Sequence, residues 1–278
     1  TDTSFLVIPS LYTPMGYLSS ALSADFLEKL QIKLVCFLQL CYTILIKKEK
    51  RLKIMVKLIA TDMDGTLLDD EKRLPVEFPK LLEVLTERNV AFAVASGRSY
   101  PALQTLFQEK TDSLLLICDN GAHVRMPGQP PVYQCMPFSV VHAVLDICRQ
   151  LLDAVPVLCG IEGIYYPNTA KAQFQEEISN FYVQFTDLSY PALYQITDPI
   201  IKIALCAMDG PEKVLYPVLK SKFGRDYELV ISGNVWMDMM RKGVSKGNAV
   251  AKLQQMLQVT PAETMVFGDY QNDISMFS

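Results

Sequence analysis

The sequence has little histidine and no closely paired cysteines. Only His123 and His142 are present, too few for a histidine-rich metal site and for most histidine-dependent hydrolases. The seven cysteines are odd in number, scattered and never arranged as C-x-x-C, which argues against a disulfide framework or a structural zinc site. This cysteine usage indicates a reducing compartment, and we expect a cytoplasmic protein.

The chain also lacks an excess of positive charge. It has 26 Lys and Arg against 30 Asp and Glu, a formal net charge of -4. A nucleic acid is therefore not an expected partner, because polyanion-binding surfaces are strongly basic. Hydrophobic residues make up 50% of the 278 residues, which predicts a globular protein with one large domain or two smaller ones.

A hydrophobic run long enough to span a membrane is absent too. The most apolar stretch, residues 34–46, has 13 residues, whereas a spanning helix needs about 20. No small-residue cleavage site follows it, as a signal peptide would require, and a membrane is not an expected partner. We expect residues 1–54 to be an extension outside the fold. Translated sequence upstream of a natural start at Met55 and a membrane tether both stay open.

From Met55 onward, predicted strands alternate with predicted helices. Residues 56–61, 90–95 and 114–118 are apolar enough for buried strands, and residues 78–85 show helical periodicity after the first of them. This alternation predicts an α/β core, a doubly wound, Rossmann-like parallel sheet with helices on its faces. In such sheets, ligands bind beyond the carboxyl ends of the strands.

The pattern changes in the middle of the chain, where a predicted hairpin at Glu162-Gly163 and several helices indicate an inserted α+β cap domain. We expect residues 236–240 to be the first strand after the chain returns to the core, followed by a helix at 246–257. The expected domains are the first part of the core at 55–126, the cap at 127–232 and an incomplete second part of the core at 233–278.

The first predicted strand ends in Asp62-Met63-Asp64-Gly65-Thr66. Two carboxylates at i and i+2 past a strand can face the same crevice. Buried acids are costly unless they bind a cation or hydrogen-bond donors, and the Gly-Thr turn adds backbone N–H groups and a hydroxyl. Such a loop suits a phosphate and a hard metal ion.

Further polar motifs follow the other predicted strands or open a predicted helix. Ser96-Gly97-Arg98 follows the second strand, Asp119-Asn120-Gly121 follows the third, Lys246 opens a helix, and Asp269 to Asp273 follows the last predicted strand. Each has a simpler interpretation: a turn, a surface arginine or a solvated lysine at a helix start. Together they place acids suited to Mg²⁺ beside a serine and a lysine suited to phosphate.

In this order the four motifs resemble those of the haloacid dehalogenase-like superfamily of phosphotransferases. Their spacing and the insert before Lys246 are most similar to its Cof-type sugar-phosphatase branch, with a class II, type B cap. The resemblance covers residues 55–278. It implies a phosphatase that uses Mg²⁺ to hydrolyse small phosphorylated metabolites such as sugar phosphates.

The resemblance also implies residue roles. Asp62 would attack phosphorus and form an aspartyl-phosphate, while Asp64 would protonate the leaving alcohol and then activate water. Mg²⁺ would be held by the Asp62 carboxylate, the Asp64 main-chain carbonyl, Asp269 and Asp273. The implied phosphate and substrate contacts are Thr66, Ser96, Gly97, Arg98, Asn120, Gly121, Lys246 and Asn272.

Two features bear on the alternatives. Related P-type ATPases have a threonine where this chain has Asp64, so an acid there favours hydrolysis over a long-lived aspartyl-phosphate. A phosphomutase also keeps this acid, and it is a less favoured alternative than a phosphatase. Relatives continue past the position of Ser278, which indicates a C-terminally truncated sequence and leaves open a catalytically impaired, phosphate-binding fragment. The sequence does not name the substrate, because specificity is expected to lie in the cap.

Overall fold

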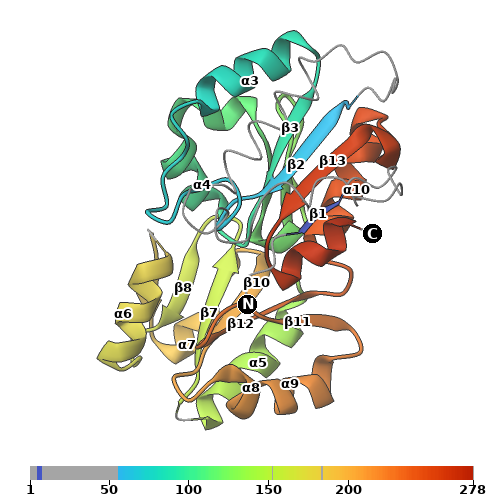
Figure 1. The fold of residues 1–278 in the computed structure, drawn as a ribbon. Helices are drawn as coiled ribbons and strands as arrows, with labels where there is room; N and C mark the ends of the chain where they lie inside the picture. Colours follow the sequence, from blue (N-terminus) through green and yellow to red (C-terminus); the bar gives the residue numbers. More distant parts are fainter. Residues whose placement is uncertain (1–4, 8–55, 152, 183, 278) are drawn as a thin grey trace, which may run out of the picture. The chain divides into compact units, whose positions relative to one another are not determined.

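The computed structural model describes residues 5–7 and 56–277, except residues 152 and 183. Within the described part, the chain forms two compact units (Figure 1). Unit 1 comprises residues up to Ser96 together with Lys246–Ser278, and unit 2 comprises Gly97–Ser245. The apolar run at 34–46 lies outside the described residues.

The centre of unit 1 is a parallel sheet. Strand β2 (Leu58–Asp62) pairs in parallel with β3 (Ala91–Ala95) on one side and with β13 (Thr264–Gly268) on the other. All five residues of β2 are buried, as expected for a strand covered on both faces. The predicted parallel core is therefore confirmed.

A short strand, β1 (Phe5–Val7), pairs antiparallel with β13. These three residues belong to the segment that we expected to lie outside the fold, and for them that expectation is wrong. The rest of residues 1–54 lies outside the described part of the chain, so the wider expectation stays a prediction.

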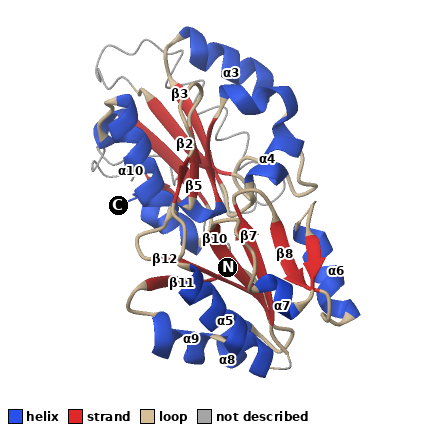
Figure 2. Ribbon diagram, turned by 180° about the vertical axis from the view of Figure 1, so that it is seen from behind, coloured by secondary structure: helices blue, strands red, loops and turns tan. Residues whose placement is uncertain are grey.

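Helices cover this sheet on opposite sides, α3 (Phe78–Glu87) on one and α10 (Lys246–Leu257) on the other (Figures 1 and 2). Along α10, Lys246, Ala249, Val250 and Leu253 are buried, which is the spacing of one helix face. The chain then enters the 3₁₀ turn η3 (Pro261–Glu263), where Thr260 and Glu263 form a capping box. After β13, the short helix η4 (Gln271–Phe277) follows.

Unit 2 contains the predicted α+β insert. An antiparallel ribbon is formed by β4 (Leu115–Cys118), β5 (His123–Arg125) and β6 (Val132–Tyr133). A six-stranded sheet has the order β11-β12-β10-β7-β8-β9. Its strands are β7 (Val155–Gly160), β8 (Ile164–Pro167), β9 (Thr186–Leu188), β10 (Ile200–Cys206), β11 (Tyr227–Ile231) and β12 (Trp236–Arg241).

The two faces of the six-stranded sheet have separate cores. Along β10, Ile203 and Leu205 pack on one face with residues of α5, whereas Ala204 and Cys206 pack on the other with residues of α6. This alternation is the two-residue period of a strand. The helices of unit 2 are α4 (Tyr100–Phe107), α5 (Phe138–Gln150), α6 (Ala172–Phe181), α7 (Tyr190–Leu193), α8 (Pro211–Val214) and α9 (Tyr216–Phe223).

One detail of unit 2 differs from the sequence-based expectation. Strand β12 was expected to begin the returning core, but it pairs with β10 and β11 in the six-stranded sheet. The expected boundary at residue 233 is thus wrong for this strand, and the other domain limits stay predictions. Helices α8 and α9 follow one another closely but are separate, because Pro217 supplies no N–H donor for a continuous helix.

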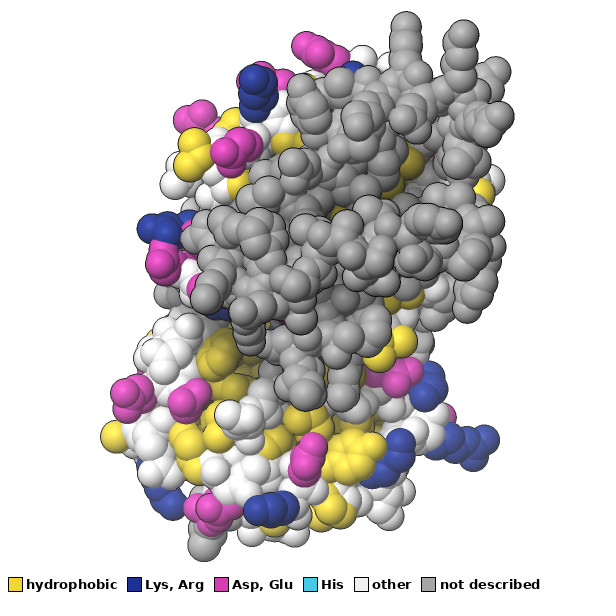
Figure 3. All heavy atoms as spheres, in the orientation of Figure 1, with side chains coloured by type: hydrophobic (Ala, Val, Ile, Leu, Met, Phe, Trp, Pro, Cys, Tyr) yellow, Lys and Arg dark blue, Asp and Glu magenta, His cyan; other side chains and the backbone are white. Residues whose placement is uncertain are grey.

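In the lower part of the view in Figure 3, hydrophobic side chains gather, with acidic and basic side chains scattered around and among them. Among the described residues, no helix combines the length and the apolar character that crossing a bilayer requires.

Candidate active site

The site of unit 1 begins at the carboxyl end of the parallel sheet. Asp62 is the last residue of β2, and its register partner in β3 is Ala95. Ser96, which is 1% exposed, follows directly. Parallel strands end at the same edge of a sheet, so Asp62 and Ser96 leave the sheet side by side, as predicted.

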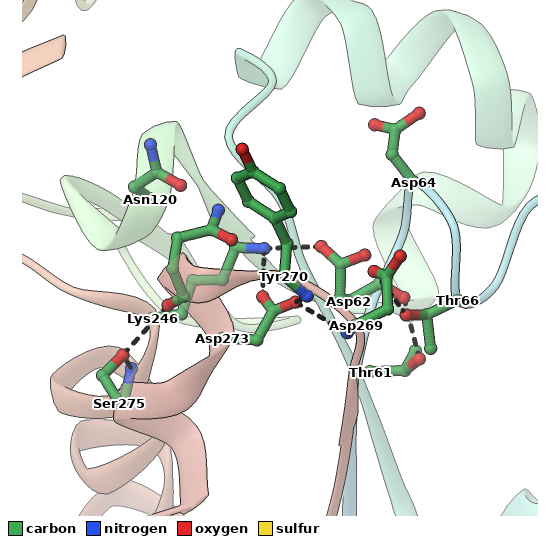
Figure 4. Close-up of polar contacts among 12 residues, drawn as sticks. Thr61, Asp62, Asp64, Thr66, Asn120, Lys246, Asp269, Tyr270, Asp273 and Ser275 are labelled. Carbon is green, nitrogen blue, oxygen red and sulfur yellow. Dashed lines mark hydrogen bonds and ion pairs between the residues drawn. The ribbon is translucent and has the colours of Figure 1, made fainter. Parts of the chain in front are cut away.

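Lys246 connects this edge to α10. It is the first residue of that helix and is only 1% exposed. Its Nζ donates to Asp62 Oδ1 at 2.5 Å and to Asp273 Oδ1 at 2.7 Å (Figure 4). A solvated surface role for this lysine is therefore excluded.

Asp273 is fully buried and has two functions in the site. One oxygen accepts from Lys246, while the other accepts from the backbone N–H groups of Asp269 and Tyr270, each at 3.0 Å. The same carboxylate thus balances the lysine and holds the loop after β13, which carries Asp269.

The turn after Asp62 approaches this loop closely. Thr66 Oγ1 donates to Asp269 Oδ1 at 3.1 Å. Gly65 has φ +86°, and a Cβ at this position would lie 2.2 Å from Asp269 Oδ2. Only glycine allows both this backbone conformation and this approach. The Asp-x-Asp-Gly-Thr motif and Asp269 therefore form one structural unit.

These residues form what we call the Lys246 cluster: Asp62, Lys246, Asp269 and Asp273. Its three carboxylates each offer one oxygen, and these oxygens lie within 4.8 Å of one another. Asp62 Oδ2 is buried, and no donor among the described residues bonds to it. One ammonium cannot balance three carboxylates, so the cluster fits a further cation with a preference for oxygen ligands, such as Mg²⁺.

The electrostatics of the cluster agree with this fit. Burial raises the pKa of Asp62 from 3.8 to about 7, and Asp273 adds to this rise while Lys246 opposes it. Burial alone would lower the pKa of Lys246, but Asp62 and Asp273 raise it above its ordinary value. Lys246 is thus held in its charged form, whereas a bound cation would favour ionised Asp62.

Asp64 lies apart from the Lys246 cluster. Its carboxylate points away from Asp62 and Asp269 (Figure 4), and its Oδ1 is 3.1 Å from Lys72 Nζ. Lys72 adopts φ 61° in a turn closed by the Asp69 carboxylate, which accepts from two backbone N–H groups. This ion pair was not predicted from the sequence.

The other predicted contacts fall into two groups. Asn272 lies on η4 within unit 1. The other four contacts belong to unit 2: Gly97, Arg98, Asn120 and Gly121. Within unit 2, the segments 97–98 and 120–121 lie close together, since a Cβ on Gly97 would lie 3.2 Å from Asn120 Oδ1. Whether these residues touch the substrate stays a prediction.

Sequence reasoning missed a second charged group, which we call the Lys202 cluster: Asp119, Lys202 and Asp238. All three are buried in unit 2, and Lys202 Nζ lies 3.0 Å from Asp119 Oδ1. The sequence signal that could have indicated this cluster is a charged residue within an otherwise apolar stretch. Such a residue is Lys202 in β10 and Asp238 in β12. A buried charge is retained only with partners.

Comparison with known proteins gives one matching family, haloacid dehalogenase-like hydrolase, over residues 59–278. The 5-amino-6-(5-phospho-D-ribitylamino)uracil phosphatase YbjI of Escherichia coli is 26% identical over 223 residues, which cover 80% of this chain and 81% of that protein. The HMP-PP phosphatase of Cronobacter sakazakii is 29% identical over 226 residues, with 81% of each chain covered.

Solved structures show the same fold. SMU.1108c from Streptococcus mutans superposes with a TM-score of 0.72 at 25% identity, covering 80% of this chain and 84% of that chain. The subclass IIB sugar phosphatase BT4131 gives a TM-score of 0.66 at 22% identity, covering 80% and 84%. The resemblance inferred from the four motifs and the α/β fold with an inserted cap are both confirmed.

Proposed function

We propose that this chain, which belongs to the haloacid dehalogenase-like hydrolase family, is a Mg²⁺-dependent phosphatase that hydrolyses small phosphorylated metabolites through an aspartyl-phosphate. The observation that carries the proposal is the state of Asp62. One of its oxygens is held by Lys246, while the other is buried without a donor among the described residues. That second oxygen is available to a cation or to an electrophile.

In the proposed first step, an Asp62 oxygen attacks phosphorus, and the bond from phosphorus to the leaving oxygen breaks. Lys246 fixes the orientation of the Asp62 carboxylate and supplies positive charge beside the transferred phosphoryl group. Ser96, at the same sheet edge, is a donor for phosphoryl oxygens. Asp64 gives a proton to the leaving oxygen, which requires its side chain to turn from Lys72 toward the substrate.

In the second step, Asp64 accepts a proton from water as that water attacks the phosphorus of the aspartyl-phosphate. The Asp62 carboxylate is released, and inorganic phosphate is formed. An acid at position 64 supports hydrolysis over storage of the phosphoryl group, because it can act as the base that a threonine could not provide.

The residues proposed to hold Mg²⁺ are Asp62, Asp269 and Asp273, with the main-chain carbonyl of Asp64. When bound, the ion would neutralise charge on the phosphoryl oxygens. The chain's own contribution is to keep these ligands in place: Asp273 holds the loop of Asp269, and Thr66 donates to Asp269. The cytoplasmic location also stays a proposal, supported by the cysteine usage.

The substrate class is proposed from the relatives. The two relatives from Escherichia coli and Cronobacter sakazakii are named phosphatases, and their named substrates are small phosphorylated molecules. These names support a small metabolite rather than a phosphoprotein or a nucleic acid, in agreement with the net charge of -4.

The experiment is a phosphate-release assay on p-nitrophenyl phosphate and a panel of phosphorylated sugars and pyrimidines, with Mg²⁺ and with EDTA. We expect release that requires Mg²⁺ and is lost in Asp62→Asn. Retained activity in that variant would contradict the proposed mechanism. Binding of phosphate without turnover in the wild type would instead support the impaired-fragment alternative.

A further inference from the structure

The Lys202 cluster lies on the face of the six-stranded sheet that packs against α6. Lys202 is 3% exposed and Asp238 is 5% exposed. Lys202 Nζ lies 3.0 Å from Asp119 Oδ1 and 4.0 Å from Asp238 Oδ2, and it donates to the carbonyl oxygen of Gly97 at 3.1 Å. The lysine therefore links a rigid strand to two loop segments.

Further hydrogen bonds connect the same two segments. The backbone N–H of Asp119 donates to the carbonyl of Arg98 at 3.0 Å. The side-chain amide of Asn120 donates to Asp238 Oδ2 at 3.2 Å. Gly97–Arg98 and Asp119–Asn120 are thus fixed to each other and to strands β10 and β12.

The backbone at Asp119–Asn120 needs such support. Asp119 has φ 49° and Asn120 has φ 54°, so two successive residues other than glycine adopt the left-handed conformation. Aspartate and asparagine tolerate this region better than most residues other than glycine, but two of them in succession need support from their surroundings. Strain of this kind collects at sites where geometry serves function.

Lys202 keeps its positive charge in the folded state. Burial alone would lower the pKa of Lys202, but Asp238, Tyr182 and Asp119 together raise it well above its ordinary value. Burial raises the pKa of Asp238, which Lys202 opposes. Lys202 therefore remains a cation that can hold both a carboxylate and the Gly97 carbonyl.

We infer that Lys202 is a positioning residue that holds Gly97–Arg98 and Asp119–Gly121 in the backbone geometry used to bind the substrate. The inference rests on the proposed function, because these segments contain the predicted substrate contacts of unit 2. Gly97 also follows Ser96 directly in the chain, so a rotation of its peptide group would be transmitted to that residue.

The test uses a double variant that removes the Lys202–Asp119 ion pair and leaves Asp238 the hydrogen bond that it accepts from Asn120. Lys202→Met/Asp119→Asn keeps the side-chain sizes similar, and asparagine tolerates the left-handed conformation at position 119. The matched control is Lys171→Met/Asp153→Asn, the same two substitutions at an exposed pair of unit 2 whose atoms lie 3.4 Å apart. Lys202→Arg is the conservative variant, because it keeps a charge and donors.

The first readout is steady-state kinetics on p-nitrophenyl phosphate with saturating Mg²⁺. We expect KM to rise by about 10-fold or more in Lys202→Met/Asp119→Asn, with a smaller change in kcat, because misplaced binding groups weaken substrate contacts. Lys202→Arg should recover part of this loss, and the exposed control should stay within about 2-fold of wild type. An unchanged KM in the buried double variant would overturn the inference.

The second readout is amide hydrogen exchange, which does not depend on activity. Peptides containing residues 97–98 and 119–121 should exchange about 10-fold faster in the buried double variant, while peptides from β7 and β8 keep the wild-type rate. Unchanged exchange at the loops, or equally faster exchange throughout unit 2, would overturn the positioning role. A wild type without phosphatase activity would refute the proposed function, and exchange would still decide whether Lys202 holds these segments.

Discussion

The two units each bury one lysine among carboxylates, but the two clusters differ in what they leave free. In the Lys246 cluster, three carboxylates converge with one ammonium, and an oxygen of Asp62 has no donor among the described residues. In the Lys202 cluster, the ammonium faces two carboxylates, and it also donates to the backbone carbonyl of Gly97. On our proposals, similar side chains serve a reactive site in one unit and a structural link in the other.

The difference shows that burial of charge is not itself a sign of catalysis. Buried ion pairs cost desolvation energy, and many give little net stability. What distinguishes the Lys246 cluster is an excess of acids that Lys246 cannot balance, at the carboxyl edge of a parallel sheet. What distinguishes the Lys202 cluster is its attachment to strained backbone.

The largest expected effect concerns the carboxylates. Asp62→Asn should lower kcat by about 10⁴-fold or more, because it removes the proposed nucleophile. Asp238→Asn, an identical change in the other cluster, should lower kcat/KM by no more than about 10-fold, because it leaves the Lys202–Asp119 pair intact. Phosphate release under saturating Mg²⁺ measures the activity of both variants. Equal losses of activity in Asp62→Asn and Asp238→Asn would contradict the proposed difference between the two clusters.

The next effect concerns Lys246. Lys246→Met should reduce kcat by about 10² to 10³-fold, since it removes charge beside the transferred group. It also leaves buried carboxylates without their cation, so the unfolding free energy without Mg²⁺ should fall by about 3 kcal/mol. Urea denaturation with and without Mg²⁺ checks this: a loss of stability that Mg²⁺ does not reduce would contradict the proposed metal site.

A smaller effect is expected from two glycines with similar backbone angles. Gly65→Ala should weaken Mg²⁺ binding by about 10 to 100-fold, because the new methyl group would displace Asp269. Gly210 in unit 2 has φ +90°, but a Cβ there would meet no atom within 4 Å. Gly210→Ala should therefore cost about 1 kcal/mol of stability and leave Mg²⁺ affinity unchanged. Calorimetric titration with Mg²⁺ separates the two outcomes.

A last expected difference between the units, which leaves activity at neutral pH unchanged, is one of pH dependence. Burial lowers the pKa of His123 in unit 2 from 6.5 to about 4, so the unfolded state binds more protons between these pH values. The contribution of neutral His123 to the free energy of unfolding is fully present above pH 6.5. It is lost as the pH falls toward 4, by up to about 3 kcal/mol. The pKa of Asp62 is raised, so in the metal-free protein its contribution to the free energy of unfolding has the opposite pH dependence and increases as the pH falls. Urea unfolding of wild type and His123→Gln from pH 7 to pH 4 tests this, and parallel curves would contradict it.

Much of the fold and of the Lys246 cluster could be predicted from the sequence, because both depend on local signals. The apolar strands carry polar motifs at their ends, and the capping box at Thr260 depends on neighbours in the chain. The pairing of Lys246 with both Asp62 and Asp273 was less visible, since a lysine at a helix start has the same local pattern when solvated.

The errors arose where partners are distant in sequence. Strand β12 is apolar enough for either sheet, and nothing in its pattern names β10 and β11 as its neighbours. Lys202 and Asp119 are separated by a large part of the cap, so a lone charge in an apolar strand could indicate burial but not its partner. The ion pair of Asp64 with Lys72 depends on a turn whose left-handed residue, Lys72, has no local sequence signature.

The most direct test of the central claim, that Asp62 is the reactive carboxylate, is to trap the aspartyl-phosphate. An enzyme quenched in acid during turnover with Mg²⁺ is reduced with borohydride, which converts an acyl phosphate on aspartate to homoserine, and peptides are identified by mass spectrometry. We predict homoserine at position 62 only, and none in the Lys202 cluster. Turnover with no homoserine at position 62, or with homoserine at another aspartate, would contradict it.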